Sequence, residues 1–494
     1  MINPGKSIIS IAIAASTIVA VSCSKETSHT TGWEYNNSKN GGFEVAPYKE
    51  QQTGPGLVLI EGGTFTMGRV TDDPMYEWNN IARRVTVPTF YMDETEVANV
   101  DYVEYLYWIS RVFGSDFPEV YRKALPDTLV WREKMSYNEP LVETYLRHPA
   151  YRNYPVVGVS WIQANDYCLW RTDRVNEELL VKYGILDYSP DQKNENNFNT
   201  ESYLAGQYEG LVNKPLKDLN PNGTGERRVK LEDGIMLPKY RLPTEAEWEF
   251  AAYGLIGNTQ LERVVERKVY PWSGTIMRTD DKKYYGSFMT NFKRGRGDYM
   301  GVAGNLNDGA DLPAEVGSYW PNDYGLYNMA GNVAEWVLDV YRPLTFEDAY
   351  DYSPFRGNVF KTKVTDAEGI LVPKDSLGRI RYREVTTEES VNRLNYRQAN
   401  QINYLDGDYQ STISPDWTIT PDNPNTTNLM YEYSKTSLIS DKSRVYKGGS
   451  WKDPAYYMSP SARRFMDENI AANYIGFRCA MTRVGSASPA GTRK

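Results

Sequence analysis

The spacing of apolar residues changes along the chain and predicts strands in some stretches and helices in others. Alternating apolar positions in residues 56–68, "GLVLIEGGTFTMG", predict a hairpin with its turn at the paired glycines. Residues 85–90 repeat the alternation and predict a further strand. Asn99 is predicted to cap a helix. Behind it, apolar residues recur at helical spacing: Val103, Leu106 and Tyr107.

Two further helix starts are predicted by capping boxes. In "SWIQANDYCLW" the pair is Ser160 and Gln163, and in "RLPTEAEWEFAA" it is Thr244 and Glu247. Each side chain of such a pair bonds a backbone N–H that the first helical turn leaves without a partner. A cap of this kind stabilises a helix by about 1 kcal/mol. The two stretches therefore predict helices, and they carry no chemistry of their own.

Long polar stretches interrupt these elements near residues 113–154, 183–238 and 342–444. Loops of this length inside a compact domain are usually either functional or disordered. The stretches are interpreted as inserts that provide surfaces for partners, with disordered decoration as the alternative. The last residues, 485–494, are predicted to be a loose tail.

The N-terminus has the pattern of a targeting segment. An apolar run, residues 8–21, follows Lys6 and is too short to span a bilayer comfortably. Cys23 stands directly after a small residue, which predicts a lipoprotein signal peptide over residues 1–22 and acylation of Cys23. The alternative is an ordinary signal peptide with a chance cysteine. Residues 23–53 are polar and predict a tether with little core of its own.

Composition narrows the classes of function. The 494-residue chain has 40% hydrophobic residues, enough for a core, and a net charge of −9 with acids and bases intermixed. A nucleic-acid binder needs a basic face, so nucleic acid is not an expected partner. The only histidines are His29 and His148, which disfavours histidine-based catalysis. Besides Cys23, Cys168 and Cys479 could pair in an oxidising compartment, although the sequence alone does not bring them together.

A tight turn near the C-terminal end suggests a former site. The stretch "GGSWKDPAYYMSPSARRF", residues 448–465, begins with paired glycines, which are typical of a turn that presents groups to a ligand. The residues that follow contain no cysteine or histidine, and Asp453 is the only acid in the next ten. The turn is therefore predicted without an obvious reactive group.

Seven phrases in order carry a family resemblance: "GGTFTMG", "FYMDETEVAN", "PVVGVSWIQANDYCLW", "RLPTEAEWEFAA", "NDYGLYNMAGNVAEW", "KGGSW" and "GFRCA". Together they resemble the formylglycine-generating enzyme (sulfatase-modifying factor) family. The resemblance implies an irregular α+β fold, related to C-type lectins, in a single domain over residues 54–484 with long insertions. It also implies a disulfide between Cys168 and Cys479.

The same resemblance implies that the oxidase chemistry is lost. Active members carry two cysteines after the glycine turn, which bind copper and oxidise a substrate cysteine to formylglycine. The aligned positions here are Asp453 and Met458. Copper(I) prefers thiolates to a hard carboxylate or a neutral thioether. We therefore expect no catalytic residues and no copper in a pseudoenzyme; a ligand-binding or residually active oxidase is the alternative.

Structural calcium is the cofactor that the resemblance implies. Backbone carbonyls, amides and acids would supply the oxygens, with water completing the shell. The motif "NMAGNVAEW" provides the first set: Asn328, Gly331, Val333 and Glu335. A second alignment implied by the resemblance provides another set: Asn291, Phe292, Asp308 and Ala310. The alternative is that the Gly-Asn turn only packs Trp336 and needs no ion.

Lipidation, the missing cysteines and the inserts resemble the gliding-motility and type IX secretion lipoproteins. Residues 31–45 and 62–80 look most like GldJ, and GldK (PorK) is next. This implies a lipid-anchored protein on the periplasmic face of the outer membrane that acts as a structural docking component. The implied partners are the ring-forming lipoprotein GldK/PorK and its partner GldN/PorN, besides the membrane itself.

Overall fold

The computed structural model describes residues 26–69, 75, 77, 79–265, 268–295, 308–310, 312–342, 350–386, 388–390 and 441–485. The signal peptide, Cys23, most of the tail and residues 391–440 of the third insert lie outside these ranges. The helices are α2 (Asn99–Phe113), α3 (Pro118–Ala124), α4 (Glu139–Thr144), α5 (Trp161–Lys182), α6 (Thr200–Leu204), α7 (Glu245–Tyr253) and α8 (Gln260–Val264).

Two four-stranded sheets form the centre of the fold. The first has the order β1 (Leu57–Ile60), β4 (Phe90–Asp93), β14 (Ala480–Thr482), β7 (Tyr240–Arg241), all antiparallel. The second has the order β12 (Arg464–Asp467), β11 (Ser443–Lys447), β8 (Ala334–Val340), β13 (Ile475–Gly476), and its β13–β8 pair is parallel. Both sheets thus join C-terminal strands to strands from far earlier in the chain.

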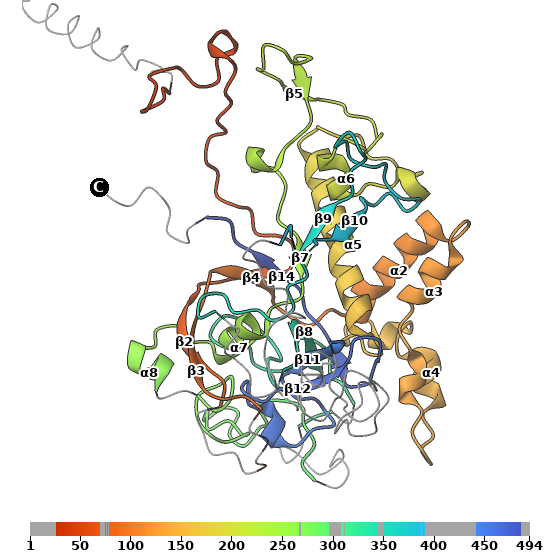
Figure 1. Cartoon of the computed structure of the whole chain (residues 1–494). Coiled ribbons are helices and arrows are strands. Elements are labelled where there is room, and N and C mark those ends of the chain that lie inside the picture. The colour runs from red at the N-terminus through yellow and green to blue at the C-terminus, as the bar shows by residue number, and fades with distance from the viewer. Residues whose placement is uncertain are drawn as a thin grey trace, which may run out of the picture.

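Three short two-stranded sheets complete the strand inventory of the described residues. They are β2 (Gly63–Met67) with β3 (Arg83–Val87), β5 (Leu216–Lys217) with β6 (Glu226–Arg227), and β9 (Lys361–Lys363) with β10 (Tyr382–Glu384). Helices α2 to α6 gather on one flank of the molecule, beside the sheets (Figure 1). This mixture of short strands, helices and long loops confirms the predicted α+β class.

Both predicted capping boxes are confirmed. Ser160 Oγ accepts from Gln163 N at 3.3 Å, and Thr244 Oγ1 accepts from Glu247 N at 3.2 Å. The prediction for Asn99 is wrong, because Ala98 occupies the cap position and Asn99 is the first helical residue. Its side-chain amide instead donates to the carbonyls of two residues between α4 and α5, Tyr145 and Tyr151.

Two other expectations need correction. The predicted hairpin over residues 56–68 does not form, since β1 pairs with β4 and β2 pairs with β3. Each strand finds a longer-range partner, and the glycines only turn the chain from one sheet to another. On α2, Leu106 is buried as expected, but Tyr107 is 69% exposed, because the helix buries the face of Tyr102 and Ile109 instead.

The inserts are ordered where they are described. The first contains α3 and α4, and α3 packs against α2. The second has an apolar core of its own, in which Phe198, Tyr203 and Tyr208 pack ring against ring. Asn197 in the second insert donates to the carbonyl of Leu377 in the third. In these ranges, disordered decoration is not what the structure shows.

The N-terminal tether also has more structure than predicted. Figure 1 shows residues 26–53 running beside the second insert, which contains β5, and away from the sheets. Glu44 accepts from the backbone of Leu219 and pairs with Arg227 in the β5–β6 sheet. The tether is therefore attached to the second insert by a charged contact. Among the described helices, none combines the length and apolarity that crossing a membrane requires.

Candidate functional site

The paired glycines after β11 make a turn that strongly favours glycine. Gly448 and Gly449 have φ of +94° and +68°, in the left-handed region. A Cβ on Gly448 would lie 3.0 Å from Cζ2 of Trp248. A Cβ on Gly449 would lie 2.6 Å from Cε of Met458, because the chain after the turn folds back over it. The predicted tight turn is therefore present and closely packed.

Asp453, the first position that the family resemblance aligns with a catalytic cysteine, is held in an ion pair. Its two carboxylate oxygens accept from Nη1 and Nη2 of Arg464 at 2.6 Å each. The Ser450 hydroxyl donates to one of the same oxygens. Asp453 is 9% exposed, so the pair is largely shielded from water. Such a bidentate pair occupies the carboxylate and gives it a structural partner.

Met458, the second position that the resemblance aligns with a catalytic cysteine, is a core residue. Its side chain has no exposed surface and packs with apolar residues from two other segments, Phe288, Phe292 and Ala330. Copper(I) requires soft ligands that are free to approach the ion. A carboxylate bound to a guanidinium and a thioether fixed in the core do not form such a set. The residues at the turn therefore do not fit a copper ion.

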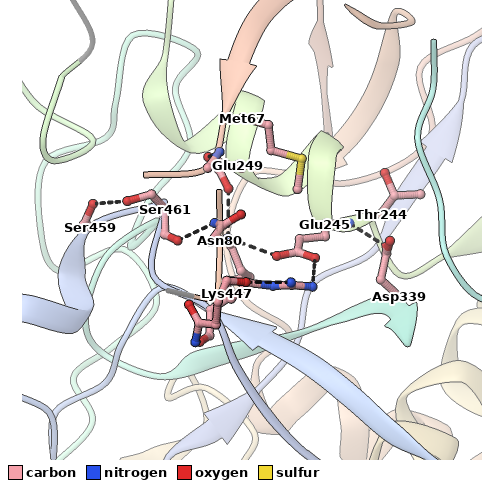
Figure 2. A network of polar contacts seen from close by, with 12 residues as sticks. Met67, Asn80, Thr244, Glu245, Glu249, Asp339, Lys447, Ser459 and Ser461 are labelled. Atoms are coloured by element: carbon pink, nitrogen blue, oxygen red, sulfur yellow. Dashed lines mark hydrogen bonds and ion pairs between the residues drawn. The ribbon is translucent and has the colours of Figure 1, made fainter. Parts of the chain in front are cut away.

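A buried charge network includes the residue directly before the turn (Figure 2). Lys447, the residue directly before the glycines, donates to Glu249 at 2.9 Å and lies 3.4 Å from Glu245, both on α7. Arg463 donates to Glu245 at 2.8 Å. The backbone N–H of Glu245 donates to Asp339 at 2.7 Å. The network joins α7, β8 and β11, and so fixes the base of the turn.

Burial changes the protonation of this network. Desolvation, and next the negative charge of Glu245, raise the pKa of Asp339 to about 7. Burial also opposes ionisation of Glu245, but the cations Arg463 and Lys447 outweigh it and lower the pKa of that carboxyl. Glu245 is thus the charged acid of the pair, and Asp339 is the acid whose proton is retained to near-neutral pH.

A second buried network lies around Glu335 on β8. Arg478 donates from Nε and Nη2 to the two Glu335 oxygens at 2.7 and 2.6 Å, and Trp248 Nε1 donates at 2.8 Å. Nearby, Glu96 accepts from the Asn328 and Asn332 amides at 3.0 Å each. Burial raises the pKa of Glu96 to about 8 against the lowering influence of Arg478.

The first predicted calcium set is only partly suited to an ion. The side chain of Asn328 is buried, and its Oδ1 has no hydrogen-bond partner among the described residues. The negative charge of Glu335, however, is already matched by Arg478. Gly331 forms the turn between them with φ of +73°, and Val333 packs in a small apolar cluster. A cation here would share the carboxylate with a guanidinium.

The second predicted set fits an ion better. Asp308 accepts from the backbone N–H of Phe292 and of Ala310, both at 3.4 Å, so these residues lie together. Asn291 is buried with Oδ1 unpartnered, while its Nδ2 donates to the carbonyl of Leu312. An amide oxygen, a carboxylate and backbone carbonyls are the donors calcium prefers. Within the described ranges, no group of three or more His, Cys, Asp or Glu side chains forms a metal site.

The remaining cysteines are adjacent. Cys168 on α5 and Cys479 before β14 are buried, with sulfurs 3.4 Å apart and not bonded to each other. A disulfide has an S–S distance of about 2.05 Å. The structure thus brings together two residues that are 311 positions apart. The bond itself stays a prediction from the resemblance.

Sequence reasoning missed the cations that occupy these sites. Arg464 and Arg478 stood inside the quoted motifs, yet nothing in their spacing indicated an acid partner. Arg478 pairs with an acid 143 positions away, and Lys447 with one 198 positions away. Only the pair of Arg464 with Asp453, 11 positions apart on the returning turn, was within local reach.

The chain is similar to formylglycine-generating enzymes and to proteins related to them. The model of the sulfatase-modifying factor enzyme 1-like domain (FGE-sulfatase) matches residues 42–384. The chain is 26% identical over 303 residues to the formylglycine-generating enzyme of Mus musculus, covering 57% of this chain and 58% of that protein. It is 25% identical over 312 residues to the inactive C-alpha-formylglycine-generating enzyme 2 of the same organism, covering 58% and 70%.

Solved structures with a likeness to the chain include PvdO from Pseudomonas aeruginosa, at 15% identity and a TM-score of 0.40, covering 88% of this chain and all of that one. Treponema denticola variable protein 1 matches at 17% identity and a TM-score of 0.36, with the same coverage. The chain spans just under three fifths of the length of the mouse and Bos taurus formylglycine-generating enzymes.

Proposed function

The chain belongs to the sulfatase-modifying factor enzyme 1-like family, and from that premise we propose that it is a member without oxidase activity that serves as a docking body. The family contains relatives whose names state that they are inactive. One observation carries the proposal. At the two positions that the family resemblance aligns with the copper-binding cysteines, the structure has an ion-paired aspartate and a buried methionine. Neither side chain is free to bind copper or to accept electrons from a substrate thiol.

A combined binding and activity assay tests the loss of oxidase chemistry. Copper(I) is titrated anaerobically into the full chain in competition with a chromogenic chelator. The same protein is incubated with a cysteine-containing sulfatase peptide and copper in air, and the peptide is analysed by mass spectrometry. We expect no tight copper binding and no formylglycine. The mouse formylglycine-generating enzyme is the positive control, and formylglycine above the no-protein background contradicts the proposal.

We further propose that the protein is a lipid-anchored component of the type IX secretion and gliding-motility machinery, most similar to GldJ. The sequence features that support this are the cysteine after the signal sequence, the missing thiols and the large inserts. The proposed place is the periplasmic face of the outer membrane. The proposed partners are the ring-forming lipoprotein GldK/PorK and its partner GldN/PorN.

The anchor and the partners are tested separately in the native cell. Replacing Cys23 with Ala is expected to move the protein from the membrane fraction to the soluble fraction and to abolish labelling by a palmitate analogue. Chemical cross-linking followed by affinity purification is expected to recover the ring proteins. Retention of the C23A variant in the membrane contradicts the anchor, and recovery of no secretion component contradicts the partner assignment.

The second candidate function is ligand binding or residual oxidase activity on the same fold. It is favoured by the unpartnered buried oxygens of Asn291 and Asn328, which are suited to a bound cation or ligand. Replacing residues 391–440 with a short Gly/Ser linker separates the two candidates. Loss of secretion with an unchanged melting temperature supports docking, whereas normal secretion with loss of a bound small molecule supports the second candidate.

As part of the same proposal, calcium is a structural ion bound at the site formed by Asn291 and Asp308. When bound, the ion would supply positive charge to Asn291 Oδ1, which is buried without a hydrogen-bond partner, and to the Asp308 carboxylate. Asn291 and Asp308 would hold it through their side chains, and Phe292 and Ala310 through their carbonyls. Removing calcium with a chelator is expected to lower the melting temperature, and Asp308→Asn is expected to abolish that difference. A chelator-independent melting temperature contradicts this site.

A further inference from the structure

The N-terminal tether contains a motif that the glycine turn and its chemistry do not explain, "TGWEYNNSKNGGFEV" at residues 31–45. This stretch is folded on itself. The backbone N–H of Ser28 donates to the carbonyl of Trp33 at 2.9 Å. The Asn36 side chain exchanges two hydrogen bonds with the backbone of Val45, at 2.8 and 3.0 Å. The tether is therefore locally ordered, and its side chains have defined surroundings.

Three large rings of the tether face solvent. Trp33, Phe43 and Tyr48 are 62%, 67% and 65% exposed. The Tyr35 ring contacts Phe43 edge to face, with centroids 5.6 Å apart, and still leaves most of Phe43 uncovered. Folded segments usually bury rings of this size, because each can remove about 150–250 Å² from water. Their exposure on an ordered segment indicates a surface that another body covers.

The rest of the protein does not provide this cover. Figure 1 shows the first part of the tether, in red, at one end of the molecule, beside β5 and away from the two four-stranded sheets. Its contact with the second insert uses the Glu44 carboxylate, which pairs with Arg227, and the backbone at Gly42. A Cβ on Gly42 would lie 1.9 Å from the carbonyl oxygen of Leu219, so this contact is close. The tether is thus attached to the insert while its three rings stay outside.

The tether begins beside the proposed lipid anchor. Glu26, the first described residue, is three residues after Cys23, and an extended chain spans at most about 11 Å over that length. Ser28 is at most about 18 Å from Cys23 by the same measure, and its hydrogen bond places Trp33 directly opposite it. An acylated Cys23 would therefore hold this part of the tether at the surface of the bilayer.

The charges of the tether do not oppose contact with lipid. Two of its acids are neutralised by cations elsewhere in the chain, Glu44 by Arg227 and Glu50 by Arg483. The remaining acids and the lysines of residues 26–53 are equal in number. The tether thus presents its rings without an excess of negative charge, which an anionic lipid surface would repel.

We propose that Trp33, Phe43 and Tyr48 lie in the interfacial layer of the bilayer in which Cys23 is anchored. Tryptophan and tyrosine concentrate in this layer, where the ring meets apolar chains and the N–H or O–H meets water and headgroups. The rings give the protein a second membrane contact besides the acyl chains. Because the tether is bonded to the second insert, this contact orients the insert relative to the membrane. The inference rests on the proposed lipid anchor and names a lipid surface as the partner of the tether.

Chemical coupling to vesicles tests the contact without depending on acylation in the cell. The chain from Cys23 onward is attached through the Cys23 thiol to phosphatidylcholine vesicles that carry a maleimide lipid. Cys168 and Cys479 are buried, so the coupling is specific. Tryptophan emission is compared in three kinds of vesicle: without bromine, with lipids brominated near the headgroup end of the acyl chain, and with lipids brominated near its methyl end.

We expect bromine near the headgroup to quench part of the emission, and bromine near the methyl end to quench less, because the rings stay at the interface. Trp33→Phe is expected to abolish this quenching at an unchanged melting temperature. Trp320→Phe, at a 40% exposed tryptophan between α8 and β8, is the matched control and should keep it. Equal quenching of the wild type and W33F, or no quenching of either, overturns the proposal.

A second pair of variants tests the other rings. Phe43→Glu adds a charge to the proposed contact and is expected to reduce the quenching of Trp33. Ser38→Glu adds the same charge at an exposed position of the tether that carries no ring, and is expected to reduce it less. Hydrogen exchange at Leu219 N, which donates to Glu44, checks that the tether stays attached to the insert. Full quenching in F43E overturns the placement of the Phe43 ring.

These outcomes are separate from those of the anchor assay. Absence of palmitate labelling in the cell would contradict the anchor, while the coupled vesicles would still report whether the rings enter lipid. A Trp33 that stays unquenched on coupled vesicles overturns the lipid contact and leaves the anchor and the docking role standing.

Discussion

Charge pairs hold together two regions of this molecule, and the regions bury them to different depths. In the network around Glu335 on β8, Arg478 and Glu335 have no exposed side-chain surface at all. In the second insert, Arg227 pairs with Glu44 and Asp233, and these side chains keep 13–23% of their surface exposed. Coulomb interactions strengthen where water is excluded, and so does the penalty of losing one partner. Losing one partner of a buried pair should therefore destabilise the first region strongly, whereas losing a partly exposed pair should destabilise the insert and tether only a little.

The largest expected effect comes from breaking a pair at the centre of the first region. Glu335→Gln leaves the Arg478 guanidinium buried without its counter-charge and weakens the bond from Trp248. Breaking one side of a buried pair costs about 3–5 kcal/mol. We expect the free energy of unfolding, measured in urea, to fall by that amount. Glu139→Gln, in an exposed pair with Arg132, is the control and should leave the unfolding curve unchanged. Similar curves for both variants would remove the distinction between the regions.

The next effect depends on pH. Burial raises the pKa of Glu96 to about 8, so the folded protein keeps a proton that the unfolded chain loses near pH 4.5. Between these values the folded state binds more protons, and stability falls as pH rises, by at most about 1.4 kcal/mol per unit for one group. Asp339 acts in the same direction up to about pH 7.

Glu96→Gln removes the ionisable group and is expected to flatten the decline of unfolding free energy between pH 5.5 and 8. Urea unfolding at several pH values measures the slope. Glu119→Gln, on the exposed surface of α3, is the matched control and should retain the wild-type slope. An unchanged slope in E96Q would show that Glu96 is ionised in the folded state.

A smaller loss of stability is expected from glycine substitutions, and two of them distinguish close packing from backbone strain at the turn. Gly449→Ala places a Cβ 2.6 Å from Met458 and forces a left-handed φ on alanine, which we expect to cost about 2 kcal/mol. Gly286→Ala also has a positive φ, +85°, but has no atom within 4 Å of the added Cβ. Its expected cost is about 1 kcal/mol from the backbone alone. Thermal melts compare the two, and equal losses would mean that the turn is not closely packed.

The smallest effect belongs to the second region. Arg227→Gln removes the cation that joins Glu44 of the tether to the insert, and partly exposed pairs contribute about 1 kcal/mol or less. We expect global stability to change little, while hydrogen exchange at Leu219 N, which donates to Glu44, becomes faster. Lys39→Gln in the same tether is the control. Unchanged exchange at Leu219 in R227Q would mean that this charge does not hold the tether.

Local patterns predicted the parts of the fold that local physics controls. The capping boxes of Ser160 and Thr244 formed as predicted, because a cap needs only residues within one turn. The hairpin over residues 56–68 did not form, because strand partners are chosen by the sheet and not by the intervening turn. The cap at Asn99 failed for a related reason, since its amide found buried carbonyls from another segment.

The same distinction between local and tertiary information applies to the candidate site. The identities of Asp453 and Met458 and the absence of thiols from the turn could be read directly from the sequence. That Asp453 is matched by Arg464, that Met458 is part of the core, and that Asn291 Oδ1 is buried without a partner could not.

By itself, the sequence determined the family, the α+β class, two helix starts with capping boxes and the absence of thiols from the turn. Each of these depends on residue identity or on neighbours a few positions apart. The tertiary structure alone decided which acids are paired, which keep a proton, and which polar atoms are left for a ligand. Those properties depend on burial and on partners up to several hundred positions away, and the linear order of residues does not specify either.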